Sequence, residues 1–206
     1  MADGEQEKWT EEKVKMFLGK QSEVEIRVLK ALEELEFPFT AMVLVEPKNY
    51  AAIKNSILTK FNVGDQYVIY ISLNTSFQKL YSDFSRDNKS LDNVYFLDMI
   101  SANSGAKIIN LPNVEYVNSP SDLTDCIMLL EKKLDAMPNK RVIILLDSVT
   151  TVAVYNDPSV VEKFIHVLIG KASSYNVSAI LLSPDYGETK SITETIEQFM
   201  DKTIKV

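Results

Sequence analysis

The sequence has few of the residues that cross-link small proteins or bind transition metals. Its 206 residues include one cysteine and one histidine. Cys126 falls within the apolar helical pattern set by Leu123 and Leu130, so a disulfide framework within the chain is excluded and a buried thiol is expected. His166 lies inside another helical pattern and has no second histidine to pair with. We therefore expect no metal site of the zinc type and no hydrolytic centre built on an activating histidine.

The sequence also lacks an excess of positive charge and a long apolar run. It has 22 Lys and Arg against 29 Asp and Glu, a net charge of −7, with no basic stripe. Phosphate binding needs a Lys and Arg surface, so this balance argues against a general nucleic-acid binder. No apolar run approaches the ~18 residues that cross a membrane, and the first residues, 1–7, are acidic. We expect a cytoplasmic protein without membrane contact.

Length and pattern predict one domain with a short N-terminal appendage. A chain of 206 residues buries roughly 70% of its unfolded surface, which suffices for one substantial core. Residues 1–38 form the predicted helical extension, with Thr10 as N-cap, an interruption near Gly19, and Pro38 stopping the helix after Phe37. The apolar stripe of this helix is Val24, Val28, Leu32 and Leu35. We expect the stripe to pack on the domain's own sheet. The alternative is that the helix docks a partner. Residues 39–206 form the domain itself.

After Pro38 the apolar pattern changes repeatedly between strand-like and helical periods, which is typical of parallel βα units. The predicted strands are 41–45, 67–72, 94–98, 142–147, 179–183 and 203–206. The predicted helices are 50–61, 76–85, 123–137, 159–174 and 192–199. We expect Ser121 to cap the third of these helices and Asp157, followed by Pro158, to cap the fourth. The least regular stretch, 103–119, is predicted to hold a short strand at 114–117 and specialised surface.

The segment 140–155, KRVIILLDSVTTVAVY, reads as a buried strand that ends in Asp147 and Ser148. It resembles the Walker B strand of KaiC-like and RecA-like ATPases. Flanking segments in matching order extend the resemblance over 40–206; they are VLVEPKNYAAI, QYVIYISLNTS, NVYFLDMIS, VSAILLSPD and FMDKTIKV. The resemblance implies an α/β RecA-like fold with a mostly parallel sheet, the strand of Asp147 near its centre and any nucleotide at the carboxyl ends of the strands. It also suggests an archaeal origin.

Alternation of strands and helices alone would equally allow a Rossmann-type or a receiver-like fold. Against the Rossmann type, no glycine-rich turn follows Val45. Against a receiver, the chain is too long and its first strand does not end in an acidic pair. The order of the elements therefore favours the RecA-like alternative.

The turn in the place of the phosphate loop has none of the chemistry that such a loop requires. A phosphate loop reads G-x-x-x-x-G-K-[ST], because glycines let successive backbone N–H groups point at the phosphates while the Lys and the hydroxyl bind phosphate and Mg²⁺. Here the turn is Glu46-Pro47-Lys48-Asn49. It has no glycine, Pro47 has no N–H to donate, and a Glu46 carboxylate ~4 Å from a phosphate oxygen would cost about 1–4 kcal/mol. We predict a degenerate site and no bound nucleotide cofactor.

The end of the second strand lacks the glutamate that polarises water in the ATPases that this chain resembles. The chain has Leu73 and Asn74 there, and an amide cannot act as a general base at neutral pH. Asp147 and Ser148 persist in the Walker B position, where the resemblance would have the Asp act on Mg²⁺ through water. The alternative is that Asp147 accepts hydrogen bonds from backbone N–H groups at the end of the strand and Ser148 assists the turn. Residual pocket candidates are Lys48, Asn49, Asn74 and Asp98, the last of which could share a polar pocket with Asp147.

Three functions follow from this sequence. The leading hypothesis is a pseudo-ATPase, a non-catalytic RecA/KaiC-like binding or scaffolding module that serves regulation or signalling through protein–protein assembly or self-association. The first alternative is a divergent nucleotide-binding protein with a non-standard site. The second is a DNA-repair mediator like the non-catalytic recombinase paralogues. Aromatic residues are dense in the first two βα units and predict core packing, with an interface patch as the alternative; they are Tyr50, Phe61, Tyr67, Tyr70, Phe77, Tyr81 and Phe84.

Overall fold

The computed structural model describes residues 22–105, 108–185 and 190–206. Its strands are β1 (Thr40–Val45), β2 (Gln66–Ser72), β3 (Val94–Asp98), β4 (Val114–Tyr116), β5 (Arg141–Asp147), β6 (Ser178–Pro184) and β7 (Lys202–Lys205). Its helices are α2 (Glu23–Glu33), α3 (Tyr50–Phe61), α4 (Phe77–Arg86), α5 (Leu123–Asp135), α6 (Val149–Tyr155), α7 (Pro158–Ser174) and α8 (Lys190–Glu197), with a 3₁₀ turn η1 (Pro47–Asn49) before α3. Every predicted strand is present, and the predicted boundaries of β3 and α3 are confirmed to the residue.

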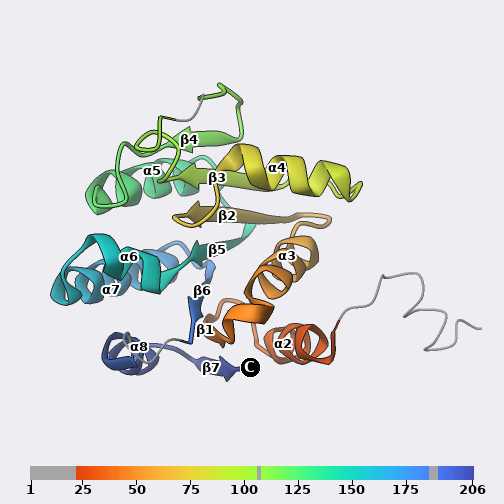
Figure 1. Ribbon diagram of the computed structural model, residues 1–206. Helices are drawn as coiled ribbons and strands as arrows, with labels where there is room; N and C mark the ends of the chain where they lie inside the picture. Colours follow the sequence, from red (N-terminus) through yellow and green to blue (C-terminus); the bar gives the residue numbers. More distant parts are fainter. Residues whose placement is uncertain (1–21, 106–107, 186–189) are drawn as a thin grey trace, which may run out of the picture.

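One seven-stranded sheet organises the described residues, in the order β4-β3-β2-β5-β6-β1-β7 (Figure 1). All six strand pairings are parallel. The strand of Asp147, β5, is fourth of seven, so the expected central place of this strand is confirmed. Because the strands are parallel, their carboxyl ends, including Ser72, Asp98 and Asp147, meet at one edge of the sheet.

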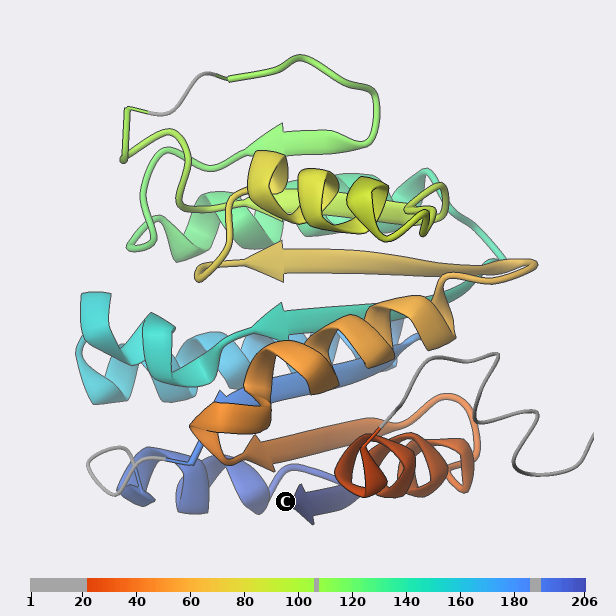
Figure 2. The ribbon, with the colours of Figure 1, turned by 45° about the vertical axis from the view of Figure 1, so that its right-hand side comes forward.

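Helices cover both faces of the sheet, which explains why the strands read as near-continuous apolar runs (Figures 1 and 2). One core joins α5, α6, α7 and α8 to one face, and a second core joins α2, α3 and α4 to the other. Alternate residues of β5 serve the two cores: Ile144 and Leu146 face the first, Ile143 and Leu145 the second. Asp147 continues the second series, and its side chain therefore points toward α3.

The N-terminal helix is shorter than predicted within the described residues. Its N-cap is Ser22, whose side chain forms a capping box with Glu25, and Glu33 is its last residue; a capping box satisfies two otherwise unpaired backbone donors. The helix ends well before Phe37, so the expectation that Pro38 stops it was wrong, while Thr10 and Gly19 lie outside the described residues. The apolar stripe packs against the sheet core as expected, with Val28 and Leu32 fully buried.

Two other local predictions differ from the structure. Asp122, not Ser121, is the N-cap of α5, and the Ser121 hydroxyl instead donates to the Tyr155 carbonyl at 3.1 Å. Helix α6 has no counterpart among the predicted elements, because its β-branched residues favour strands. The side chain of Ser148 starts this helix by accepting a bond from the Thr151 amide. Among the described residues, no helix is both long and apolar enough to cross a membrane.

Candidate functional site

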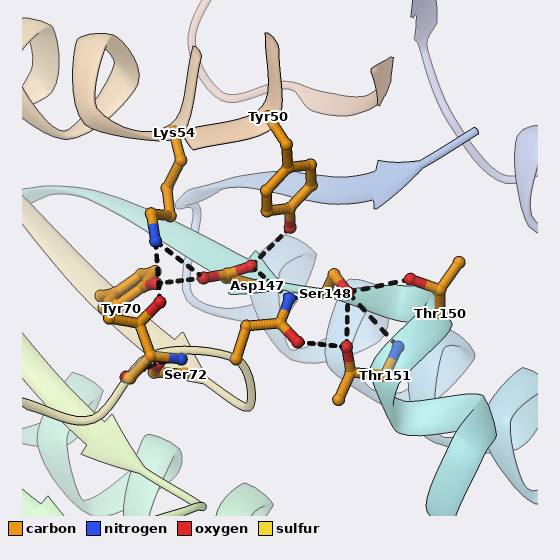
Figure 3. Close-up of polar contacts among 10 residues, drawn as sticks. Tyr50, Lys54, Tyr70, Ser72, Asp147, Ser148, Thr150 and Thr151 are labelled. Atoms are coloured by element: carbon orange, nitrogen blue, oxygen red, sulfur yellow. Dashed lines mark hydrogen bonds and ion pairs between the residues drawn. The ribbon is translucent and has the colours of Figure 1, made fainter. Parts of the chain in front are cut away.

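A buried polar cluster surrounds Asp147 at the carboxyl edge of the sheet (Figure 3). Asp147 itself is fully buried. Its carboxylate accepts hydrogen bonds from the hydroxyls of Tyr50 and Tyr70 and, at 2.9 Å, from the Asn74 amide nitrogen. The three donors come from α3, from β2 and from the loop after β2. Both carboxylate oxygens are thus bonded to side chains of the same chain.

Lys54 completes the cluster, and it was not among the residues singled out from the sequence. Its ammonium nitrogen lies 3.6 Å from a carboxylate oxygen of Asp147 and 2.9 Å from the Thr75 hydroxyl oxygen. The residue is only 6% exposed, which is rare for a lysine unless it is paired. Tyr50 and Lys54 lie one helical turn apart on α3, so both reach the same carboxylate. A lysine between the apolar positions Ile53 and Ile57 was the sequence signal for this contact.

The two tyrosine hydroxyls are held in their neutral form. Burial, together with the negative charge of Asp147, raises the pKa of Tyr50 and of Tyr70 well above the ordinary tyrosine value. Both phenols therefore keep their protons and donate to the carboxylate at neutral pH. The Asp147 charge is balanced by one buried ammonium and by three hydrogen-bond donors of the chain.

Ser148 and Asn74 link this cluster to the start of α6. The Ser148 hydroxyl oxygen lies 3.1 Å from the Asn74 amide nitrogen and 2.9 Å from the Thr151 hydroxyl oxygen, and it also accepts from the Thr151 backbone. The Thr151 hydroxyl donates to the Asn74 carbonyl oxygen. The expectation that Ser148 assists the turn is confirmed. The expectation that Asp147 accepts backbone hydrogen bonds was wrong, because the donors that the described residues supply to its carboxylate are side chains. Asn74 is bonded through both atoms of its amide group, which leaves it a positioning role.

Three backbone amides of the turn between β1 and α3 donate to carbonyl groups of the chain. The Glu46 amide donates to the Val206 carbonyl at 2.7 Å, the Asn49 amide donates to the Glu46 carbonyl at 2.9 Å, and the Tyr50 amide donates to the Pro47 carbonyl. Pro47 has no N–H. The side chain of Lys48 is 76% exposed and pairs with Glu46 at 2.7 Å. Lys48 therefore lies on the surface and is not in the Asp147 cluster, and the Asn49 side chain makes no capping bond.

Asp98 has its own set of partners. Its carboxylate accepts from the backbone amides of Phe77 and Ser101, both at 2.8 Å, from the Ile100 amide at 3.0 Å and from the Ser101 hydroxyl at 2.6 Å. In the sheet, Asp98 and Asp147 flank Ser72 on opposite sides, which places the two backbones about 10 Å apart. Within the described part of the chain, no hydrogen bond joins these acids, and Asp98 instead ties the first turn of α4 to the loop after β3.

The remaining singled-out residues lie away from this edge. Within the ranges that the structure describes, no three His, Cys, Asp or Glu side chains gather closely enough to hold a metal ion. Cys126 is fully buried in the first core, as expected. His166 lies on α7 in edge-to-face contact with Phe199. Most of the aromatics are core residues, and only Tyr81, at 51%, is an exposed member of the set.

No family model matches the chain, and no curated protein matches it either. Two solved structures of Pyrococcus horikoshii proteins share its architecture. The uncharacterized protein PH0321, crystallised in complex with an unknown peptide, superposes with a TM-score of 0.65 at 12% identity over 87% of this chain and 82% of its own. The KaiC-like protein PH0186 superposes with a TM-score of 0.52 at 12% identity over 76% of this chain and 69% of its own. The chain has an α/β RecA-like fold. At this level of identity, the likeness extends to the fold alone.

Proposed function

We propose that this chain is a non-catalytic RecA/KaiC-like module that binds or scaffolds other proteins. The observation that carries the proposal is that the Asp147 carboxylate already has partners within the chain. It accepts hydrogen bonds from Tyr50, Tyr70 and Asn74 and forms an ion pair with Lys54. Mg²⁺ demands an octahedron of oxygen ligands and keeps several waters when it binds to a carboxylate. A buried ammonium beside the carboxylate opposes a second cation there. The cluster thus supports a structural role for the acid in the Walker B position.

The turn before α3 supports the same proposal. Nucleotide phosphates need backbone N–H groups that converge on them, and here the amides of Glu46, Asn49 and Tyr50 are committed to carbonyls. Asn74 stands where the resembled ATPases carry a glutamate, and its amide is bonded to Asp147 and Thr151. These contacts support the proposal that neither the turn before α3 nor Asn74 serves phosphate binding or water activation.

A protein partner is the class of ligand that we favour. PH0321, which shares the fold, was crystallised with an unknown peptide, and this precedent supports peptide binding by a domain of this shape. A cytoplasmic location, an archaeal origin and a signalling role stay predictions.

Thermal shift with nucleotides tests the proposal. A ligand at about one hundred times its Kd stabilises the folded state by roughly 2.7 kcal/mol, which raises the Tm of a domain of this size by about 5–11 °C. We expect no shift with millimolar Mg-ATP, Mg-GTP or cyclic nucleotides. A saturable rise would refute the proposal, and its loss in Lys48→Ala would establish the divergent nucleotide-binding alternative. Lys48→Ala is included because this exposed residue can be replaced without disturbing the core.

The DNA-mediator alternative is tested by fluorescence anisotropy with a labelled single-stranded oligonucleotide. Phosphate contacts are strongest at low salt, so binding that depends on them must show there first. We expect no anisotropy change at low salt, because the chain carries a net charge of −7. Salt-sensitive binding would favour the mediator over the protein scaffold.

A further inference from the structure

A groove of about 460 Å³ runs between α5 and α7 on the outer surface of the first core. These two helices lie on the same side of the sheet (Figures 1 and 2). Leu123 and Ile127 from α5 and Phe164 from α7 are among the apolar residues that line it. Leu123 and Phe164 are buried members of the core, so the base of the groove is part of the packed interior.

Large apolar side chains on the same groove are exposed. Met128 is 61% exposed, Val160 42% and Val167 44%, and all three line it. Two further apolar residues at the end of α6 are exposed, Val154 at 76% and Tyr155 at 44%. The bond from Ser121 to the Tyr155 carbonyl holds that end next to the start of α5. Scattered apolar residues are normal on a surface, but a contiguous set around a groove indicates a binding site.

The dimensions of the groove fit a short helix. On α5 its lining extends from Leu123 to Glu131, and on α7 it extends from Val160 to Lys171. At a rise of 1.5 Å per residue, these spans are about 12 Å and 16 Å. A helix of two to three turns has the same length, and it would place apolar side chains at i, i+4 and i+7 along the groove.

The charged side chains at the rim of the groove indicate which charge a partner should carry there. Lys171 forms an ion pair with Glu131 across one end of the groove. Lys163, midway along α7, is exposed and has no carboxylate partner among the residues that the structure describes. The charged lining is therefore cationic in a chain whose net charge is −7. An acidic side chain opposite Lys163 complements it, and complementary rim charges govern which partners associate.

We propose that the α5–α7 groove docks an amphipathic α-helix of a partner protein, with apolar residues at i, i+4 and i+7 and an Asp or Glu facing Lys163. This inference rests on the proposed scaffolding function and names the surface that serves it. It uses neither the strand ends nor Asp147, so it can fail while the nucleotide titration still comes out as expected.

Amide NMR spectra of the labelled protein test the groove with two synthetic helical peptides. The peptides are three turns long and share one leucine stripe, with Glu beside the stripe in one and Lys at the same positions in the other. We expect the Glu peptide to shift amides of 123–131 and 160–171 and to bind about tenfold more tightly than the Lys peptide. Lys163→Glu should reverse that preference. Val167→Asp should abolish binding, while the control Val63→Asp, at an exposed valine after α3, should leave it unchanged.

Three results would overturn the inference. The first is the absence of shifts with millimolar amounts of either peptide. The second is a wrong binding pattern, either shifts confined to residues outside α5 and α7 or the same affinity for both peptides. The third is a dimer of the free protein, seen by sedimentation, that Val167→Asp dissolves and Val63→Asp preserves, because the occupant of the groove would then be a second copy of this chain.

Discussion

Removal of the charge on Asp147 should strongly destabilise the fold. In Asp147→Asn the side chain keeps its shape, but the Lys54 ammonium, whose side chain is 8% exposed, loses its counter-ion. Breaking a buried ion pair by removing one partner costs about 3–5 kcal/mol, because it leaves an uncompensated buried charge. For a domain of this size that cost corresponds to a fall in Tm of roughly 6–20 °C. Urea unfolding followed by circular dichroism measures the free energy, and calorimetry measures the Tm.

The double variant gives the sharper result. Lys54→Met alone leaves a buried carboxylate that still accepts from two tyrosines and from Asn74. Combining it with Asp147→Asn removes both charges. The loss in free energy of unfolding in the double variant should therefore be smaller than the sum of the two single losses, by at least about 1 kcal/mol. The control is Lys60→Met on the same helix, whose half-exposed ion pair with Glu33 should be worth under ~1 kcal/mol. Additive losses, or a cost of Asp147→Asn no larger than that of the control, would refute an ion pair at this site.

Three further predictions follow from other groups. Because burial and the Asp147 charge raise the pKa of Tyr50 and Tyr70, the stability they contribute is present below the unfolded tyrosine pKa of about 10 and is lost as pH rises above it. Urea unfolding should therefore show stability falling above that pH, less steeply in Tyr70→Phe, and equal slopes would contradict this. Burial raises the pKa of Cys126 to about 12, so a disulfide reagent should modify the thiol only in urea; equal rates with and without urea would show an accessible thiol. Ser22→Ala removes the capping box with Glu25 and should cost about 1 kcal/mol in urea unfolding, against a few tenths for Ser22→Gly; equal losses would contradict a side-chain cap.

The spacing of apolar residues along the chain was sufficient to predict most of the strands and helices. Strand β3 and helix α3 begin and end where their apolar periods do, because both elements bury a face whose spacing is written along the chain. The same reasoning failed for Val149–Tyr155, since a β-branched run favours a strand until Ser148 caps it as a helix. It placed the start of α5 correctly at Leu123 but chose the wrong cap, because the Ser121 hydroxyl bonds to a carbonyl that lies 34 positions away along the chain.

The sequence by itself determined the fold class and the polar residues at the strand ends, Asp147, Ser148 and Asn74 among them. It also showed that the turn after β1 lacks glycine. Only the tertiary structure decided which groups meet: strand order puts β2 between the two acids, and the packing of α3 brings Tyr50 and Lys54 onto Asp147. The physical reason is that periodicity reports which face of an element is buried, whereas a contact between elements depends on strand order, register and helix placement, which are settled only when the whole core packs.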